Sequence, residues 1–330
     1  MPGEFFLLNG GMSTISFHYK WAFIGSGYFA REVLRELYFA QLTPDLVITT
    51  PDKPAGRGMR PSPNPVKDFI MDTGIKFYEA ARINSSEVAK YLKENKFDFL
   101  VVCDFGKILK ESILSAAKYP ALNIHPSLLP CYRGAAPIER SLMDGVKETG
   151  VTIIEITMEI DAGPIVDFVK ISVERDDTKG TLMEKLAKNV PLILRRTFEA
   201  YLKGTVRKRP QQGEATYAPK IKKEELLIEW SQKSDIICNK IRALSPIPGA
   251  RTYFHNSLVK ILNARVFENT NTLKPGEIKV FDNRLIVGTG DGVLEICELQ
   301  PSGKRIMKAK EFIAGRNVNG RFFSSKEVVE

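Results

Sequence analysis

From Trp21 onward, short β-branched and aromatic runs alternate with stretches of helical periodicity. The first segments show the pattern, with strands expected at residues 22–24 and 45–49 and a helix at 29–39 between them. This alternation predicts a mostly parallel sheet with helices on both faces, because parallel strands need crossover connections. Ligands of such a sheet bind beyond the C-terminal ends of its strands. The sequence therefore predicts an α/β, Rossmann-like domain over residues 21–205.

The rest of this domain follows the same pattern. Further helices are expected at residues 86–93, 108–117, 136–143 and 181–201. Further strands are expected at residues 97–102 and 121–124, followed by an antiparallel pair at residues 151–156 and 165–173. The pair turns through Asp161-Ala162-Gly163-Pro164, where glycine and proline favour a turn.

A second domain is expected because 330 residues exceed the size at which single hydrophobic cores stop growing. After one helical stretch at residues 235–244, short alternating runs dominate. Strands are expected at residues 259–267, 276–281, 284–288 and 293–299. Several short strands with glycine-rich turns predict a small C-terminal β-barrel (OB-like) domain over residues 226–330.

The positive charge is concentrated between these two regions. Residues 203–223 contain seven Lys and Arg against Glu214, a net +6 of the chain's +9. The segment also contains Pro210, Gly213 and Pro219 and lacks apolar periodicity, so residues 206–225 are predicted to form a basic interdomain linker. A basic connector favours a nucleic-acid partner, because each neutralised phosphate releases a counterion. An ordinary solvated linker is the alternative.

Several classes of protein are excluded. The sequence has no run of about 18 uncharged apolar residues, the length of a membrane-spanning helix, so no membrane partner is expected. Residues 1–20 contain no apolar stretch followed by a small-residue cleavage site, so they are interpreted as an N-terminal extension of a cytoplasmic protein. The four cysteines are spaced too widely for a metal knuckle, and we expect free thiols.

A glycine-rich turn follows the first expected strand. Residues 25–30, Gly-Ser-Gly-Tyr-Phe-Ala, fit a loose G-x-G-x-x-G/A pattern, which raises an NAD-binding dehydrogenase as one hypothesis. The acidic residue expected at the tip of the second strand is missing, since Thr49 and Thr50 stand there. A tight strand-to-helix turn needs glycine for any ligand, so a purely structural role is the alternative.

Asn123 and His125 lie at the end of a strand in this domain, where ligands are expected. They are two residues apart, so both side chains point to the same face of an extended backbone. An amide donor and an imidazole could then hydrogen-bond a developing oxyanion and transfer a proton. A single histidine at a strand end can also be structural.

The stretch Asn-Ile-His-Pro-Ser-Leu-Leu-Pro at residues 123–130 resembles the 10-formyltetrahydrofolate-dependent formyltransferase family. The family signature is Asn-x-His followed by Ser-Leu-Leu-Pro and, further on, a catalytic Asp in an Asp-x-Gly turn, which Asp161-Ala162-Gly163 matches. The resemblance implies that Asn123 and His125 stabilise the oxyanion. It also implies that Asp161 orients His125 and, through water, helps to remove the amine proton. It implies 10-formyltetrahydrofolate as formyl donor and no metal.

Members of this family formylate glycinamide ribonucleotide, sugar nucleotides or methionyl-tRNA, so the acceptor must be inferred from other segments. The loop at residues 51–58, running on to Lys67, looks like the inserted loop of the tRNA-specific members. Residues 215–221, 228–230, 246–250 and 299–305 resemble parts of their C-terminal domain. The resemblance therefore implies initiator methionyl-tRNA as acceptor, formylmethionyl-tRNA for translation initiation as product, and a monomer. A sugar-nucleotide N-formyltransferase is the alternative within the family.

The resemblance and the charge together give three further sets of candidate residues. The folate is expected against Phe105, Gly106, Ile108, Ser127, Leu128, Leu129 and Pro130. The tRNA is expected against Lys53, Arg57, Arg60, Lys67, Arg207, Lys208, Arg209, Lys220, Lys222, Lys223, Lys304 and Arg305. The methionine side chain is expected against Tyr28 and Phe29. The chain departs from the family at Pro126, where many tRNA-specific members have glycine, and at Cys131-Tyr132-Arg133, which replaces a basic-aromatic-Arg run.

Overall fold

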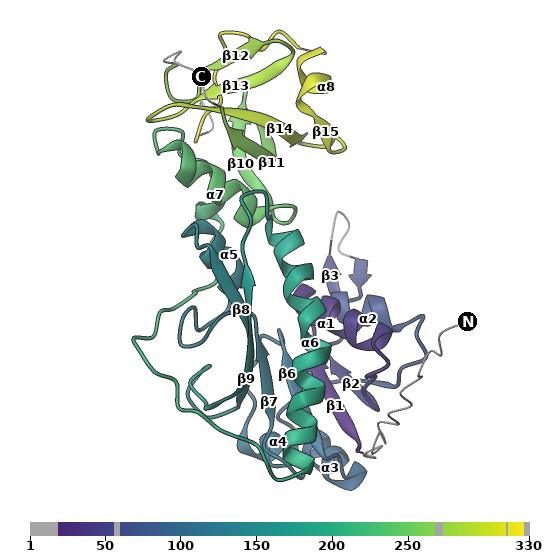
Figure 1. Cartoon of the computed structure of the whole chain (residues 1–330). Coiled ribbons are helices and arrows are strands. Elements are labelled where there is room, and N and C mark those ends of the chain that lie inside the picture. Colours follow the sequence, from purple (N-terminus) through teal and green to yellow (C-terminus); the bar gives the residue numbers. More distant parts are fainter. Residues whose placement is uncertain (1–18, 56–59, 268–272, 315, 327–330) are drawn as a thin grey trace, which may run out of the picture.

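The computed structural model describes residues 19–55, 60–267, 273–314 and 316–326, and Figure 1 shows their arrangement. Within these residues the N-terminal domain is built on a seven-stranded sheet of order β5-β2-β1-β6-β7-β8-β9. Its strands are β1 (Trp21–Gly25), β2 (Leu46–Thr49), β5 (Phe77–Glu79), β6 (Phe99–Cys103), β7 (Leu122–His125), β8 (Glu148–Glu155) and β9 (Ile165–Ser172). The strands from β5 to β7 pair in parallel, whereas β8 pairs antiparallel with both β7 and β9. The predicted Rossmann-like, mostly parallel sheet with an antiparallel pair is confirmed.

Helices cover both faces of this sheet. They are α1 (Tyr28–Phe39), α2 (Pro65–Ile70), α3 (Ser86–Asn95), α4 (Glu111–Leu114), α5 (Pro137–Met143) and α6 (Lys179–Leu202). Alternate residues of β1 face opposite sides, so Trp21 and Phe23 pack in one buried cluster with α1 and α6, while Ala22 and Ile24 pack in the other with α3 and α4. The helix expected at residues 108–117 is shorter, because α4 spans only four residues.

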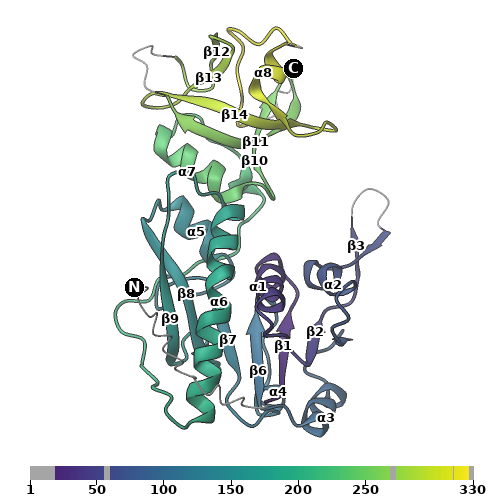
Figure 2. The same cartoon turned by 45° about the vertical axis from the view of Figure 1, so that its right-hand side comes forward.

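The structure adds local elements that periodicity did not predict. A hairpin of β3 (Lys53–Ala55) and β4 (Arg60–Ser62) projects from the sheet beside α2 (Figure 2). The side chain of Asn64 caps α2 by accepting hydrogen bonds from the N–H groups of Val66 and Lys67, and Pro65 stands at the first helical position, where a missing N–H is harmless. These elements have only three to six residues each, too few to show a hydrophobic period, and α2 depends on its cap.

The C-terminal domain is an antiparallel sheet packed against a helix. Its elements are η1 (Glu224–Leu226), α7 (Ser234–Leu244), β10 (Ala250–Phe254), β11 (Ser257–Val266), β12 (Ile278–Phe281), β13 (Arg284–Gly288), β14 (Val293–Pro301), β15 (Met307–Lys308) and α8 (Ala309–Ala314). The strand order is β10-β11-β14-β13-β12, with β15 on β14. The predicted OB-like barrel is not confirmed, because no pairing between the end strands β10 and β12 closes the sheet in the described residues. Isolated bridges instead join residues 322–324 to Tyr253 and Glu277.

The basic segment after α6 lies along the sheet and does not simply connect two neighbouring ends. In Figure 1, α6 ends at the bottom of the N-terminal domain and α7 begins at its top, so the chain between them runs the height of the domain. Residues 207–219, called the strap here, pair with β9 through two backbone hydrogen bonds between Arg209 and Ile165, of 2.8 and 2.9 Å. Further on, Thr216 and Ala218 pair with residues 130–136.

Several contacts fix the C-terminal domain on α5 and the start of α6. The buried guanidinium of Arg242 donates hydrogen bonds to the carbonyls of Leu142 and Glu174, at 3.4 and 3.2 Å. Lys179 forms an ion pair with Glu139 at 2.7 Å and also contacts the C-terminal domain. No helix among the described residues is long and apolar enough to cross a membrane.

Candidate active site

The structure brings Asn123, His125 and Asp161 together at the C-terminal end of β7. Asn123 Nδ2 donates a hydrogen bond to Asp161 Oδ1 at 3.1 Å, and His125 Nδ1 lies 3.6 Å from Asp161 Oδ2. The first two residues share one face of the strand, whereas Asp161 comes from the turn between β8 and β9. The catalytic corner, as we call these three residues, lies where ligands of parallel sheets bind.

Two glycines allow the Asp161 turn to approach this closely. A Cβ atom on Gly163 would lie 1.7 Å from the Glu155 carbonyl oxygen, so only glycine fits there. The N–H of Gly134 donates to Asp161 Oδ2 at 2.9 Å, and a Cβ on Gly134 would lie 2.9 Å from the carbonyl oxygen of Ala218 in the strap. Asp161 itself has a φ of 51°, in the left-handed region, which the surrounding hydrogen bonds stabilise.

The ring of His125 is buried, with 4% of its surface exposed. Its Nε2 lies 2.9 Å from the Tyr132 carbonyl oxygen, and because a carbonyl only accepts, Nε2 must carry the hydrogen. Burial lowers the pKa of His125, while the Asp161 carboxylate and the Tyr132 carbonyl oppose that shift. The neutral ring therefore presents the lone pair of Nδ1 towards Asp161, where it can accept a proton.

The residues after β7 form a loop held by buried hydrogen bonds. The Ser127 hydroxyl donates to the Cys131 carbonyl at 2.5 Å, and Thr152 Oγ1 donates to the Ser127 carbonyl at 2.6 Å. Among the predicted folate residues, Phe105, Ser127 and Leu129 are buried, Leu128 and Pro130 are half-buried, and Gly106 and Ile108 are exposed. The Ser127 hydroxyl therefore holds the loop. Among the predicted folate residues, the exposed Gly106 and Ile108 offer more surface to a ligand than the buried ones do.

The glycine-rich turn at residues 25–30 contacts a carboxylate of the same chain. Asp104 Oδ2 accepts a hydrogen bond from the N–H of Phe29 at 3.1 Å, and the Asp104 carbonyl accepts one from Gly27 at 2.9 Å. A Cβ on Gly27 would lie 1.9 Å from Asp104 Oδ2. Because a carboxylate already occupies the start of α1, a dinucleotide phosphate would meet like charge there. This geometry argues against the dehydrogenase hypothesis. It explains Gly27 by the close approach of the Asp104 carboxylate, which leaves no room for a side chain.

The two residues predicted for the methionine pocket differ in position. Phe29 is buried in the cluster formed by α1, α6 and one face of the sheet, so it supports the core. Tyr28 is 43% exposed, and the Arg31 guanidinium lies 5.5 Å from the centre of its ring. Only Tyr28 therefore offers surface to a substrate.

The predicted tRNA-binding bases fall into two groups. Lys67 forms ion pairs with Asp52 and Glu79 at 2.7 and 2.9 Å, and Lys208 forms one with Glu155 at 2.7 Å. Arg305 likewise pairs with Glu311 at 2.6 Å. The side chains that are exposed and make no ion pair among the described residues are Lys53, Arg207, Arg209, Lys220, Lys222, Lys223 and Lys304. Arg57 and the side chain of Arg60 lie outside the described residues.

Sequence reasoning missed two residues beside the catalytic corner. Arg133 donates two hydrogen bonds to Gln211 Oε1, at 3.1 and 2.7 Å, and one to Glu159. Gln211 in turn donates to the carbonyl groups of the Asp161 turn. The unusual run at residues 131–133 was a signal for Arg133, whereas nothing in the local sequence distinguishes Gln211 from Gln212.

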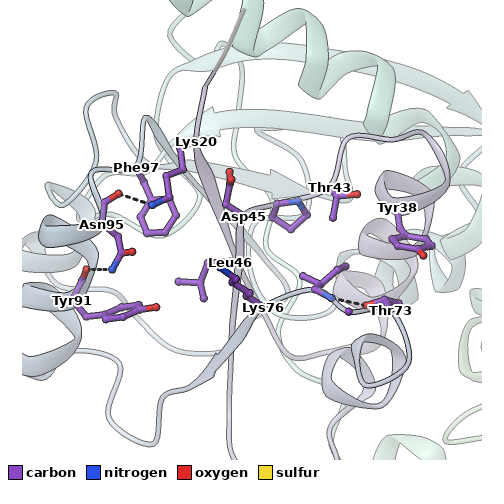
Figure 3. Close-up of a pocket in the computed structure, with 13 residues that line it drawn as sticks. Lys20, Tyr38, Thr43, Asp45, Leu46, Thr73, Lys76, Tyr91, Asn95 and Phe97 are labelled. Carbon is purple, nitrogen blue, oxygen red and sulfur yellow. Dashed lines mark hydrogen bonds between the residues drawn. The ribbon is translucent and has the colours of Figure 1, made fainter.

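A separate polar cleft of about 420 Å³ lies at the opposite end of the sheet, before β1 and β2. Figure 3 shows Lys20, Asp45 and Asn95 among its lining residues, with Lys20 Nζ donating to the Asn95 carbonyl at 2.9 Å. None of the catalytic corner residues lines it. Within the described residues no group of three or more His, Cys, Asp or Glu side chains is placed to hold a metal ion.

Two family models match the chain. The model described as "Formyl transferase" matches residues 19–197, and the model described as "Formyl transferase, C-terminal domain" matches residues 220–317. The methionyl-tRNA formyltransferase of Dictyoglomus thermophilum is 38% identical over 313 residues, covering 90% of this chain and 97% of the relative. That of Thermodesulfovibrio yellowstonii is 39% identical, covering 90% of this chain and 96% of the relative.

Solved structures resemble the chain at lower identity. HypX from Aquifex aeolicus in complex with tetrahydrofolic acid superposes with a TM-score of 0.64 at 18% identity, covering 95% of this chain. The chain spans half the length of HypX. WlaRD, a sugar 3N-formyl transferase, superposes with a TM-score of 0.58 at 21% identity, covering 88% of this chain and all of WlaRD. At these identities the likeness shows the fold alone.

Proposed function

The chain belongs to the formyl transferase family, among its methionyl-tRNA formyltransferases, and on this premise we propose how its residues carry out the reaction. The reaction transfers the formyl group of 10-formyltetrahydrofolate to the α-amino group of methionine on initiator tRNA. The product is formylmethionyl-tRNA for translation initiation. The folate is a co-substrate that gives up its formyl group in each turnover.

The observation that carries the mechanism is the meeting of an amide, an imidazole and a carboxylate at one strand end. The neutral amine attacks the formyl carbon and forms a tetrahedral oxyanion. One amide hydrogen of Asn123 is used by Asp161 Oδ1, which leaves the second for the oxyanion. Because Asp161 fixes the amide, this donor is oriented before the substrate arrives.

His125 is proposed to move the proton. As the amine attacks, Nδ1 of the neutral ring accepts the amine proton, and the nearby Asp161 carboxylate stabilises the imidazolium that forms. When the tetrahedral intermediate collapses, the bond between the formyl carbon and N10 of the folate breaks. The proton on Nδ1 then passes to N10, so the ring is neutral again and the charges balance.

The exposed bases of the strap and of the segment after it are proposed to bind the tRNA backbone. Lys220, Lys222 and Lys223 lie just beyond the residues that pair with the loop at 130–136, so they carry charge close to the catalytic corner. The hairpin of β3 and β4 is proposed to contact the acceptor end. We propose further that the C-terminal sheet is OB-like, with residues 322–324 bridging β10 and the start of β12.

The limits of these regions are also proposals. We assign residues 21–205 to the catalytic domain, 206–225 to the basic linker and 226–330 to the tRNA-binding domain. The buried clusters support this division, because those with α1 and α6 and with α3 and α4 belong to the N-terminal domain, whereas a separate cluster with α7 belongs to the C-terminal domain. We propose that the protein acts as a monomer in the cytoplasm, where charged initiator tRNA is available.

The acceptor is tested by transfer of a labelled formyl group from 10-formyltetrahydrofolate to charged tRNA. We expect methionyl initiator tRNA to be formylated and methionyl elongator tRNA to be formylated much more slowly. An amino-sugar nucleotide serves as the rival acceptor. Efficient labelling of the sugar, with none of the tRNA, would remove the proposed acceptor while leaving the formyl-transfer chemistry in place.

A further inference from the structure

Gln211 of the strap connects two segments that form the catalytic corner. Its Nε2 donates to the carbonyl oxygens of Asp161 and Gly163, at 2.7 and 2.9 Å. Its Oε1 accepts from Arg133 Nε and Nη2, at 3.1 and 2.7 Å. Because a guanidinium only donates and a carbonyl only accepts, the amide has one possible orientation. All four hydrogen-bonding positions of the Gln211 side chain are therefore occupied.

Packing alone does not hold the turn that contains Asp161. The apolar side chains next to it point into solvent, with Met158 and Ile160 exposed by 72% and 59%. Asp161 also has a φ of 51°, in the left-handed region, which costs a residue with a side chain some free energy. Hydrogen bonds from the strap therefore stabilise this turn more than hydrophobic burial does.

The strap also holds the other side of the corner. The N–H of Arg133 donates to the Thr216 carbonyl at 2.9 Å, and the N–H of Ala218 donates to the Arg133 carbonyl at 2.7 Å. This pairing fixes the loop that presents the Tyr132 carbonyl to His125 and the Gly134 N–H to Asp161. Gln211 thus links the loop that holds His125 to the turn that carries Asp161.

We propose that Gln211 is a positioning residue for formyl transfer: through two hydrogen bonds it fixes Asp161 where it can orient Asn123 and His125. The inference rests on the proposed function, because it assigns Gln211 a part in the same reaction. Gln211 does not touch the substrates and acts only through Asp161. Its loss should therefore lower kcat and leave the KM values for both substrates within about twofold, since small displacements of catalytic groups can lower rates by up to about a hundredfold.

Three variants separate this role from a simple structural one. Gln211→Ala removes all the hydrogen bonds, and Gln211→Glu keeps an acceptor for Arg133 but loses both donors to the Asp161 turn. Gln212→Ala is the matched control, because Gln212 is the exposed neighbour of the same chemistry. We expect kcat to fall at least about tenfold in both Gln211 variants and to stay unchanged in the control. Wild-type kcat in Gln211→Glu would overturn the proposal, because holding Arg133 would then be sufficient.

A double variant tests whether Gln211 acts through Asp161. In an Asp161→Asn background, measured in single turnovers, Gln211→Ala should have little further effect on the rate. A loss as large as in the wild-type background would overturn the proposal, since it would show an action independent of Asp161.

The ring of His125 provides a readout that needs no turnover. The chain has only three histidines, so each imidazole can be followed by NMR during a pH titration. The Asp161 carboxylate raises the pKa of His125, so a displaced Asp161 should lower it in Gln211→Ala and leave it unchanged in Gln212→Ala. An unchanged titration in Gln211→Ala would overturn the proposal. A wild-type protein that formylates no methionyl-tRNA would instead remove the proposed function, whatever the titration shows.

Discussion

The catalytic corner and the basic surface are built in opposite ways. In the corner, Asn123, His125 and Asp161 are largely withdrawn from solvent, and each contacts another member of the set. The basic surface, by which we mean Lys220, Lys222 and Lys223, is exposed, and each of these lysines is proposed to act through its charge. The proposed catalysis depends on the distances between a few groups of the corner, whereas the proposed tRNA binding depends on the summed charge of several similar lysines.

This difference separates the kinetic effects that each region can have. A donor in the corner contributes to the transition state, so its loss should appear in kcat. A surface lysine contributes to the capture of a phosphate backbone, so its loss should appear in KM and in the dependence on salt. Three predictions test this separation and a fourth tests an ion pair beside the surface lysines, ordered from the largest expected effect to the smallest.

Asn123→Ala should have the largest effect. It removes the donor proposed for the oxyanion, and the loss of one such donor typically raises the barrier by about 2.7 to 4 kcal/mol. We expect kcat to fall about a hundredfold or more, with KM for tRNA and thermal unfolding little changed. Asn95→Ala is the control, because Asn95 lies at the opposite end of the sheet. A normal kcat in Asn123→Ala would contradict the proposed role.

Reversing the charges of Lys220, Lys222 and Lys223 to glutamate should mainly raise KM for tRNA. Removing about three phosphate contacts should reduce the slope of log KM against log salt concentration by about 2 to 3. Lys67→Met is the contrasting variant, because Asp52 and Glu79 already hold its ammonium group. We expect its salt slope to match the wild type. An unchanged slope in the triple variant would contradict the assignment of these lysines to the tRNA.

The pH dependence should differ between the two regions too. The proposed mechanism needs a neutral His125, and burial lowers the pKa of this ring. We therefore expect kcat to persist below the usual histidine pKa of about 6.5 and to fall only at lower pH. Asp161→Asn removes a charge that raises this pKa, so the remaining activity should persist to still lower pH. A shift towards higher pH would contradict the assignment. Because the unfolded ring binds a proton more readily, the contribution of His125 to stability is complete above about pH 6.5 and declines below it.

The smallest effect concerns Glu225 in η1, a few residues beyond the strap. The Arg140 guanidinium, 2.6 Å from Glu225, and the Lys222 N–H lower the pKa of Glu225 from its usual 4.5 to about 2. The ionised carboxylate therefore stabilises the fold above about pH 4.5, and this contribution is lost as the pH falls towards about 2. Because the pair is partly exposed, we expect less than about 1 kcal/mol. Glu225→Gln should remove this pH-dependent part of the unfolding free energy, measured by denaturant unfolding between about pH 2 and 5. If the pH dependence of the unfolding free energy is unchanged in the variant, the ion pair between Arg140 and Glu225 is not formed.

Local patterns predicted the regular elements well. The strand–helix alternation gave the parallel sheet, and the spacing of Asn123 and His125 placed both on one face of β7. The glycine-rich turn was ambiguous because glycine serves phosphate binding and close packing equally, and only the position of Asp104 decided between them. The resemblance supplied Asp161, which lies 36 residues beyond His125 in the sequence.

Contacts between distant segments could not be predicted in this way. The strap is held in place by backbone pairing with β9 and with residues 130–136, and it does not need an apolar face for this. Its sequence therefore shows no hydrophobic periodicity from which its position could be predicted. The pairing of Gln211 with Asp161 joins residues 50 positions apart, and no local signal distinguishes Gln211 from Gln212. The ion pairs of Lys67 and Lys208 likewise depend on folding, so the sequence alone could not distinguish these two bases from the unpaired members of the predicted tRNA-binding set.

The most direct test of the separation between corner and surface is single-turnover formyl transfer to methionyl initiator tRNA at saturating tRNA and low salt. The account predicts that the triple Lys220, Lys222 and Lys223 variant reaches nearly the wild-type rate at saturation, whereas Asn123→Ala stays about a hundredfold slower at every tRNA concentration. If saturating tRNA restores Asn123→Ala, or if the lysine variant stays slow at saturation, the proposed division between chemistry and binding is wrong.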